Sequence, residues 1–111
     1  MDLLTDELRR QLPMIHKHRN LGEEEFYMIY AKFFAVSSGV AFYVAEGELR
    51  KGEYTFWGFL ITRQFKFPSR FQITLGRLQS ADWVGGDPCQ RDETFQPDRW
   101  GAIRCTLPDL R

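Results

Sequence analysis

Three runs of aromatic and β-branched residues follow one another closely, and they constrain the fold more than any other feature of the chain. They are FYMIYAKFFAV (26–36), VAFYVAE (40–46) and YTFWGFLIT (54–62). Runs of this composition that are bounded by Gly and Ser are typical of β-strands. The connections SSG (37–39) and GELRKGE (47–53) are short. Short connections favour antiparallel neighbours, so the sequence predicts a meandering antiparallel sheet.

The segment before these runs predicts a short helix over residues 5–12. Thr5 is a suitable N-cap, and the acids that follow it suit the positive end of the helix dipole. Leu8 and Leu12 are spaced by four residues and form an apolar stripe. Pro13 ends the helix, because a residue that precedes proline is pushed out of the helical region.

Downstream, RFQIT (70–74) predicts a fourth strand, and Thr74 is placed to cap a short helix that runs through Ala81. ETFQP (93–97) predicts one last short strand.

The expected fold class is therefore α+β, with a small antiparallel sheet of about four to five strands and one or two short helices. We expect one domain over residues 1–97 and a C-terminal tail over 98–111, which Trp100 and Ile103 dock in part.

Composition excludes several functional classes. The chain has 111 residues, and its 15 cations balance its 15 acids, so no net charge steers it toward DNA or an anionic membrane. The start MDLLTDELRR is not a signal peptide, and the longest apolar run (33–45) is too short to span a membrane. There is no Walker loop, dinucleotide fingerprint or nucleophile elbow. We expect a cytoplasmic protein without a cofactor, and the balance is against an enzyme.

A basic and aromatic strip follows the third run, since no acid occurs from Tyr54 to Ala81. Its candidate binding residues are the cations Arg63, Lys66, Arg70 and Arg77 and the aromatics Trp57, Phe65 and Phe67. Positive grooves with aromatic platforms bind single-stranded nucleic acid. The other interpretation is an edge strand whose phenylalanines face the core and whose Lys and Pro prevent strand addition. The sequence leaves both open.

The order of motifs resembles a bacterial family, domain of unknown function 2958. The resemblance covers roughly residues 3–97 and rests on LLTDELRRQLP, AKFF, FYVAEGE, YTFWGFL and GDPCQRDETFQP. The matched positions are Thr5, Lys32–Phe33, Glu46–Gly47, Phe56 to Phe59, Arg91–Asp92, Phe95 and Pro97. It implies a small protein of plasmids, phages and integrated elements and no established activity. The chain departs from the family over 63–72, where members are acidic and glycine-rich.

Three polar groups are further candidates. Glu46 and the Arg91–Asp92 pair match polar positions of the family, either as an ion pair that fixes the last loop or as a carboxylate site of an enzyme. His16 and His18 could bind a metal only with added carboxylates, and Cys89 has no placed base. We therefore assign no catalytic residue and no metal ligand.

These features rank the functions. First is a non-catalytic interaction protein that binds a host protein or protein complex, for example a defence system. A nucleic-acid-binding module comes second and a carboxylate enzyme third. A homodimer is compatible with the acidic and basic segments.

Overall fold

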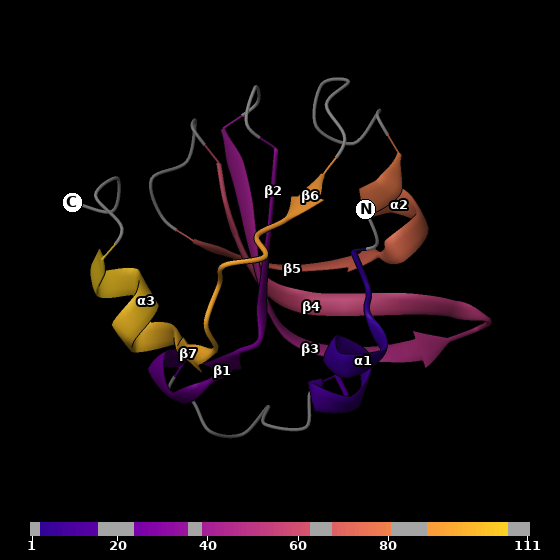
Figure 1. The fold of residues 1–111 in the computed structure, drawn as a ribbon, viewed down its shortest axis with the longest axis horizontal. Coiled ribbons are helices and arrows are strands. Elements are labelled where there is room, and N and C mark those ends of the chain that lie inside the picture. The colour runs from indigo at the N-terminus through magenta and orange to yellow at the C-terminus, as the bar shows by residue number, and fades with distance from the viewer. Residues whose placement is uncertain (1–2, 16–23, 36–38, 63–67, 81–88, 107–111) are drawn as a thin grey trace.

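The structure is a computed structural model, and it describes residues 3–15, 24–35, 39–62, 68–80 and 89–106. It has the expected α+β fold (Figure 1). Its strands are β1 (Met28–Ile29), β2 (Ala31–Ala35), β3 (Val40–Arg50), β4 (Glu53–Ile61), β5 (Ser69–Thr74), β6 (Gln90–Arg91) and β7 (Asp98–Arg99). Its helices are α1 (Asp6–Gln11), the 3-10 helix η2 (Glu24–Phe26), α2 (Leu75–Gln79) and α3 (Trp100–Thr106). The main sheet has the antiparallel order β5-β4-β3-β2-β6, and β1 and β7 form a separate two-stranded ribbon.

The β3–β4 hairpin is the centre of the sheet. β3 pairs with β4 from Ala41↔Ile61 to Arg50↔Glu53. The expected turn over 47–53 is therefore too long. The turn itself is Lys51–Gly52, where φ is 52° and 79°, as in the two-residue turns that match the twist of a hairpin. The charged residues before it continue β3, because charged side chains at the end of a hairpin lie in water and leave the backbone ladder intact.

One face of the sheet is covered by α1 and α2. Thr5 caps α1 as predicted, since its Oγ1 accepts a hydrogen bond from the Leu8 N–H at 3.1 Å. The Thr74 hydroxyl caps α2 in the same way, with Arg77 N as the donor. This side of the core, here called the helix layer, consists of Leu3, Leu8, Leu12, Ala31, Phe33, Phe42, Val44, Tyr54, Phe56, Ile73 and Leu78.

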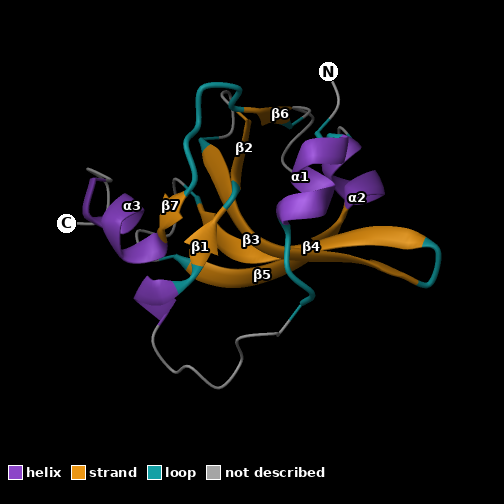
Figure 2. Cartoon of the chain, turned by 60° about the horizontal axis from the view of Figure 1, so that its bottom comes forward, coloured by secondary structure: helices purple, strands orange, loops and turns teal. Residues whose placement is uncertain are grey.

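The opposite face is covered by β1 and α3, and η2 packs against α3. Its buried residues, here called the aromatic layer, are Ile15, Tyr27, Ile29, Tyr43, Ala45, Trp57, Phe59 and Trp100. Phe56 and Trp57 are neighbours on β4 and belong to different layers, as the alternation of side chains along a strand requires. The rings of Phe59 and Trp100 stack with centroids 4.6 Å apart and 4° between their planes. Figure 2 shows α1 and α2 close together, with α3 and the ribbon at the other end of the sheet.

The segment after α1 connects the two layers. Pro13 O accepts a hydrogen bond from Gly47 N at 2.9 Å, and Ile15 N donates to Glu48 Oε1 at 2.7 Å. The first bond satisfies a backbone N–H of β3 outside the part of that strand that pairs with β2. Leu12 packs in the helix layer and Ile15 in the aromatic layer.

Three sequence predictions were wrong in the last third of the chain. The helix expected through Ala81 ends at Gln79, because the backbone of Ser80 is already extended. Residues 93–97 do not form a strand, because Asp92 Oδ1 accepts hydrogen bonds from the Thr94 N–H and hydroxyl and bends the chain instead. The expected tail contains β7 and α3, and Trp100 is 1% exposed. The docking through Trp100 and Ile103 is confirmed, since Ile103 packs against the aromatic layer.

Candidate functional site

The structure describes only part of the basic and aromatic strip, including the candidates Trp57, Arg70 and Arg77. Arg63, Phe65, Lys66 and Phe67 lie outside the described residues. Trp57 is 7% exposed and packs against Tyr27 and Phe59, with centroids 5.2 and 5.4 Å from its own. A ring buried in this way has no free face on which a nucleic-acid base could stack.

The two described cations of the strip, Arg70 and Arg77, are exposed. Arg70 is paired with Phe59 across the sheet, and Arg77 lies on α2. The described part of the strip thus keeps its cations in water and its indole ring in the core.

Glu46 is fully buried at 0% exposure, which the sequence did not predict. It is paired with Trp57, directly after a β-bulge that shifts the register of β3 between Val44 and Glu46. The bulge adds an unpaired residue to the strand, so Ala45 and Glu46 both lie toward the aromatic layer. Glu46 therefore belongs to the interior of the protein.

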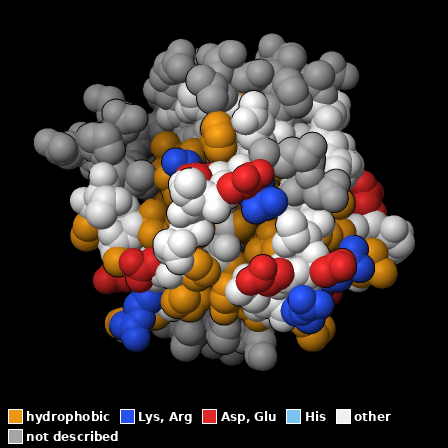
Figure 3. Space-filling view, viewed as in Figure 1, with side chains coloured by type: hydrophobic (Ala, Val, Ile, Leu, Met, Phe, Trp, Pro, Cys, Tyr) orange, Lys and Arg blue, Asp and Glu red, His pale blue; other side chains and the backbone are white. Residues whose placement is uncertain are grey.

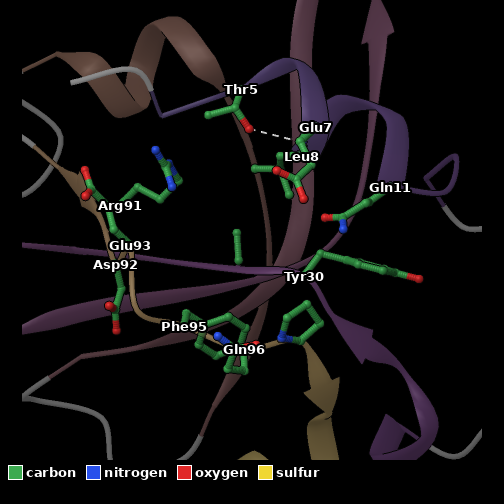
Figure 4. A pocket seen from close by; sticks show the side chains of 12 residues that line it. Thr5, Glu7, Leu8, Gln11, Tyr30, Arg91, Asp92, Glu93, Phe95 and Gln96 are labelled. Atoms are coloured by element: carbon green, nitrogen blue, oxygen red, sulfur yellow. Dashed lines mark hydrogen bonds between the residues drawn. The ribbon is translucent and has the colours of Figure 1, made fainter.

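Arg91 and Asp92 lie at the other edge of the sheet. Arg91 is paired with Phe33 on β2, and Asp92 N donates to Lys32 O at 2.9 Å. Adjacent residues of an extended chain point to opposite sides, so Arg91 lies toward α1 and Asp92 toward Tyr43. Figure 4 shows the Asp92 carboxylate pointing away from the Arg91 side chain.

A pocket of about 260 Å³ lies between α1, the start of β2 and the segment after β6, and we call it the α1 pocket (Figure 4). Its lining residues are Thr5, Glu7, Leu8, Gln11, Tyr30, Ala31, Arg91, Asp92, Glu93, Phe95, Gln96 and Pro97. Leu8 and Ala31 are buried, whereas Glu7, Gln11 and Glu93 are exposed. The pocket therefore has an apolar floor and a polar rim. Figure 3 shows side chains of both charges among hydrophobic ones on this face.

The charges beside the pocket do not form a catalytic carboxylate pair. Hydrogen bonds from the side chain and backbone of Thr94 hold the pKa of Asp92 below its ordinary value, and Lys32 acts in the same direction. A general acid needs a raised pKa, which is the opposite shift. Glu46, the second carboxylate of the enzyme hypothesis, does not line this pocket.

Tyr43 connects this edge to the core. Burial raises the pKa of Tyr43 to about 12, and the negative charge of Asp92 adds to the rise. The Lys32 ammonium lies 5.7 Å from the centroid of the Tyr43 ring, a cation–π distance. Lys32, Tyr43 and Asp92 thus form a polar group that fixes the end of β6 against the sheet.

The outer face of the β1–β7 ribbon carries three exposed side chains that we call the ribbon stripe: Phe26, Met28 and Arg99. Phe26 is 51% exposed and Met28 is 37% exposed. Arg99 is paired with Met28, and its guanidinium carbon lies 5.8 Å from the centroid of the Phe26 ring. The neighbouring residue Ile29 is buried, so β1 has one buried and one exposed side, whereas both residues of β7 are exposed.

Sequence reasoning missed the ribbon stripe. The sequence predicted a single strand over residues 26–36, and it placed Arg99 in the C-terminal tail. The pairing of β1 with β7 joins segments about seventy residues apart, and no local sequence pattern predicts such a contact. The exposed position of Phe26, directly before the alternating buried residues Tyr27 and Ile29, is a signal only once that pairing is known.

The remaining candidates are the two histidines and the two cysteines. His16 and His18 lie outside the described residues. Among the residues that the structure describes, no group of three or more His, Cys, Asp or Glu could hold a metal ion. Cys89 is half-buried and Cys105 is exposed, and neither is in a disulfide bond. None of the described helices is long and apolar enough to cross a membrane.

Comparisons with known proteins found no match to a family model, to a curated protein or to a solved structure. The resemblance to domain of unknown function 2958 therefore stays a prediction.

Proposed function

We propose that this chain is a small, non-catalytic interaction protein of the cytoplasm that binds a host protein or protein complex. The observation that carries this proposal is the ribbon stripe. Phe26 and Met28 are large hydrophobic side chains that remain exposed, although the fold buries most of its aromatic residues. Aromatic residues, Met and Arg are the types enriched in protein interfaces, and single aromatic or Arg anchors supply much of the binding energy there.

The α1 pocket extends this surface. Tyr30 and Pro97 line the pocket, and each lies two residues from a member of the Met28–Arg99 pair. At about 260 Å³ the pocket is smaller than the roughly 300–1,000 Å³ typical of sites for cofactors and drug-sized ligands. Its volume suits one side chain of a partner. The ribbon stripe supplies exposed apolar side chains, and the α1 pocket supplies a polar rim beside them. Protein interfaces commonly combine an apolar centre with a polar rim.

The family resemblance supports an origin in a mobile element, such as a phage or plasmid, and a host defence complex as one candidate partner. Several positions on which the resemblance rests, namely Thr5, Arg91, Asp92, Phe95 and Pro97, line the α1 pocket although they come from both ends of the domain. This part of the proposal rests on analogy and not on the chemistry of the site.

The test is affinity purification from host lysate treated with nuclease, followed by binding measurements with the purified partner. We expect the Phe26→Ala and Arg99→Ala double variant to lose the partner, since anchor residues commonly contribute about 2 kcal/mol or more each. The control is Arg104→Ala, a cation on the outer side of α3. Retention of the partner by the double variant would contradict the proposal, as would its disappearance on nuclease treatment.

A nucleic-acid-binding module remains the second candidate, because Arg70 and Arg77 are both exposed and no acid lies between them in the sequence. Fluorescence anisotropy with labelled single-stranded and duplex DNA, at low and then physiological salt, tests it directly. Binding that Arg70→Ala weakens and that falls steeply with salt would support this candidate. No binding at low salt would remove it.

A further inference from the structure

A second cavity, which we call the basic cavity, lies at the closed end of the β3–β4 hairpin. Its volume is about 570 Å³. Its lining residues are Arg50, Lys51, Glu53, Thr55, Gln72, Ile73, Thr74 and Arg77. They come from the hairpin, from β5 and from α2, so segments distant in the sequence converge on one concave surface. A cavity of this size can hold several residues of a peptide.

The charge of this cavity is mostly positive. Arg50 Nε lies 3.4 Å from Glu48 Oε2, and this is a partly exposed pair of modest strength. Lys51 and Arg77 form no ion pair with any residue that the structure describes. Lys51 is at the hairpin turn, where its backbone adopts φ 52° beside Gly52, and its side chain is exposed. Lys51 and Arg77 are thus available to a ligand at the cavity, and Arg50 is in a weak ion pair with Glu48.

The acid and the polar groups of the cavity leave these cations available. Glu53 forms no ion pair with a described cation, and its carboxylate lies over Gly76 of α2. The Thr74 hydroxyl already accepts the hydrogen bond of Arg77 N. The Gln72 side chain is exposed and can donate through its amide. The cavity therefore offers charged and neutral donors to a ligand that carries acceptors.

We infer that the basic cavity binds an acidic segment of a partner protein, whose Asp or Glu carboxylates contact Arg50, Lys51 and Arg77. Charge complementarity selects an anionic ligand. Acidic protein is favoured over nucleic acid because no aromatic residue is among the described residues that line the cavity, and the nearby Tyr54 is 7% exposed with Arg9 over its ring at 5.4 Å. Three cations also contact few phosphates, which gives weak binding to DNA.

This site is separate from the proposed partner surface. The hairpin end and the β1–β7 ribbon lie at opposite ends of the molecule in both ribbon views (Figures 1 and 2). The inference therefore goes beyond the ribbon stripe, and either site can fail its test without the other.

The experiment is a titration of ¹⁵N-labelled protein with a 12-residue peptide that carries glutamate at alternate positions, with the glutamine version of that peptide as the ligand control. We expect shifts of the backbone amides of Thr55, Gln72 and Thr74, and affinity that falls as NaCl rises from about 50 to about 300 mM. Lys51→Gln and Arg77→Gln should each weaken binding about twofold to fivefold, the effect of one exposed charge pair. Arg104→Gln is the matched control and should bind as the wild type does.

Three results would overturn the inference. The first is that the acidic peptide does not bind, and the second is that the glutamine peptide binds equally well. The third is tighter binding of a DNA 12-mer that shifts the same amides, which would assign the cavity to nucleic acid. Because Lys51 and Arg77 are exposed, their variants should fold, and the urea unfolding midpoint verifies this.

Discussion

The two layers that sandwich the sheet are built in different ways. The helix layer places Leu side chains of α1 and α2 on the phenylalanines of the sheet, and both helices begin at a threonine cap. The aromatic layer consists largely of Tyr, Trp and Phe rings, and Trp100 comes from far along the chain. The helices of the helix layer follow from local sequence rules, whereas the aromatic layer is completed by the contacts of Trp100 with the distant residues Tyr43 and Phe59. Its outer surface is also where the ribbon stripe lies.

The largest effect is expected at a position that both layers need. A Cβ at Gly58 would lie 2.0 Å from the Tyr43 carbonyl oxygen, and backbone cannot move away as a flexible side chain can. Gly58→Ala should therefore separate β3 from β4 and prevent folding, as measured by the loss of cooperative urea unfolding. A cooperative transition close to that of the wild type would show that the bulge beside Val44 can absorb the change.

The next effect separates the layers. Trp100→Ala should cost about 3–5 kcal/mol and Leu78→Ala about 2–5 kcal/mol of the free energy of unfolding, since both side chains are fully buried. Near-ultraviolet circular dichroism distinguishes them, because only the loss of Trp100 removes the stack on Phe59. If both variants lost the same aromatic signal, the two layers would be one cooperative unit.

A pH-dependent effect belongs to the aromatic layer. The pKa of Tyr43 is about 12 in the folded protein against an ordinary 10.0, so the folded state holds this proton more tightly than the unfolded state. The resulting stability is complete below pH 10.0 and is lost as the pH rises toward about 12. Tyr43→Phe should make the alkaline decline in the urea midpoint shallower. An unchanged alkaline decline would assign it to other groups, such as Tyr54, whose pKa burial also raises.

The smallest effect tests a cap of the helix layer. Thr5→Ala removes the acceptor for Leu8 N and should cost about 1 kcal/mol. Thr5→Ser keeps the hydroxyl and serves as the control, with stability measured by urea unfolding. A loss well above 2 kcal/mol would mean that Thr5 does more at the α1 pocket than cap the helix.

The difference between the layers also explains which elements of the fold could be predicted from the sequence. The sequence predicted α1 and α2 from the caps Thr5 and Thr74, and it predicted the central strands from the three hydrophobic runs. Both predictions succeeded because caps and alternation act over a few residues. The pairing of residues 28–29 with 98–99 could not be predicted from local patterns, and with it the exposure of Phe26 was missed, although the docking of Trp100 was predicted. Glu46 was expected at the end of a strand, but β3 continues to Arg50, and the bulge after Val44 places Glu46 on the same side as Trp57.

For the candidate site, the sequence identified Arg91 and Asp92 but not their surroundings. Both line the α1 pocket, and their side chains point to opposite sides. The cations of the basic cavity include Arg77, which the sequence had singled out. Arg50 and Lys51 were interpreted as turn residues, because their approach to β5 depends on the pairing of β4 with β5.

The late position of Trp100 has a consequence for synthesis. A ribosome delivers the chain from its N-terminus at about 5–20 residues per second, so β3 and β4 can pair before Trp100 has been made. Until then the rings of Tyr43 and Phe59, which Trp100 covers in the finished protein, face water. We expect the nascent chain to expose an aggregation-prone aromatic surface for several seconds. Folding in the cell then depends on how quickly α3 is synthesised and packs against that surface.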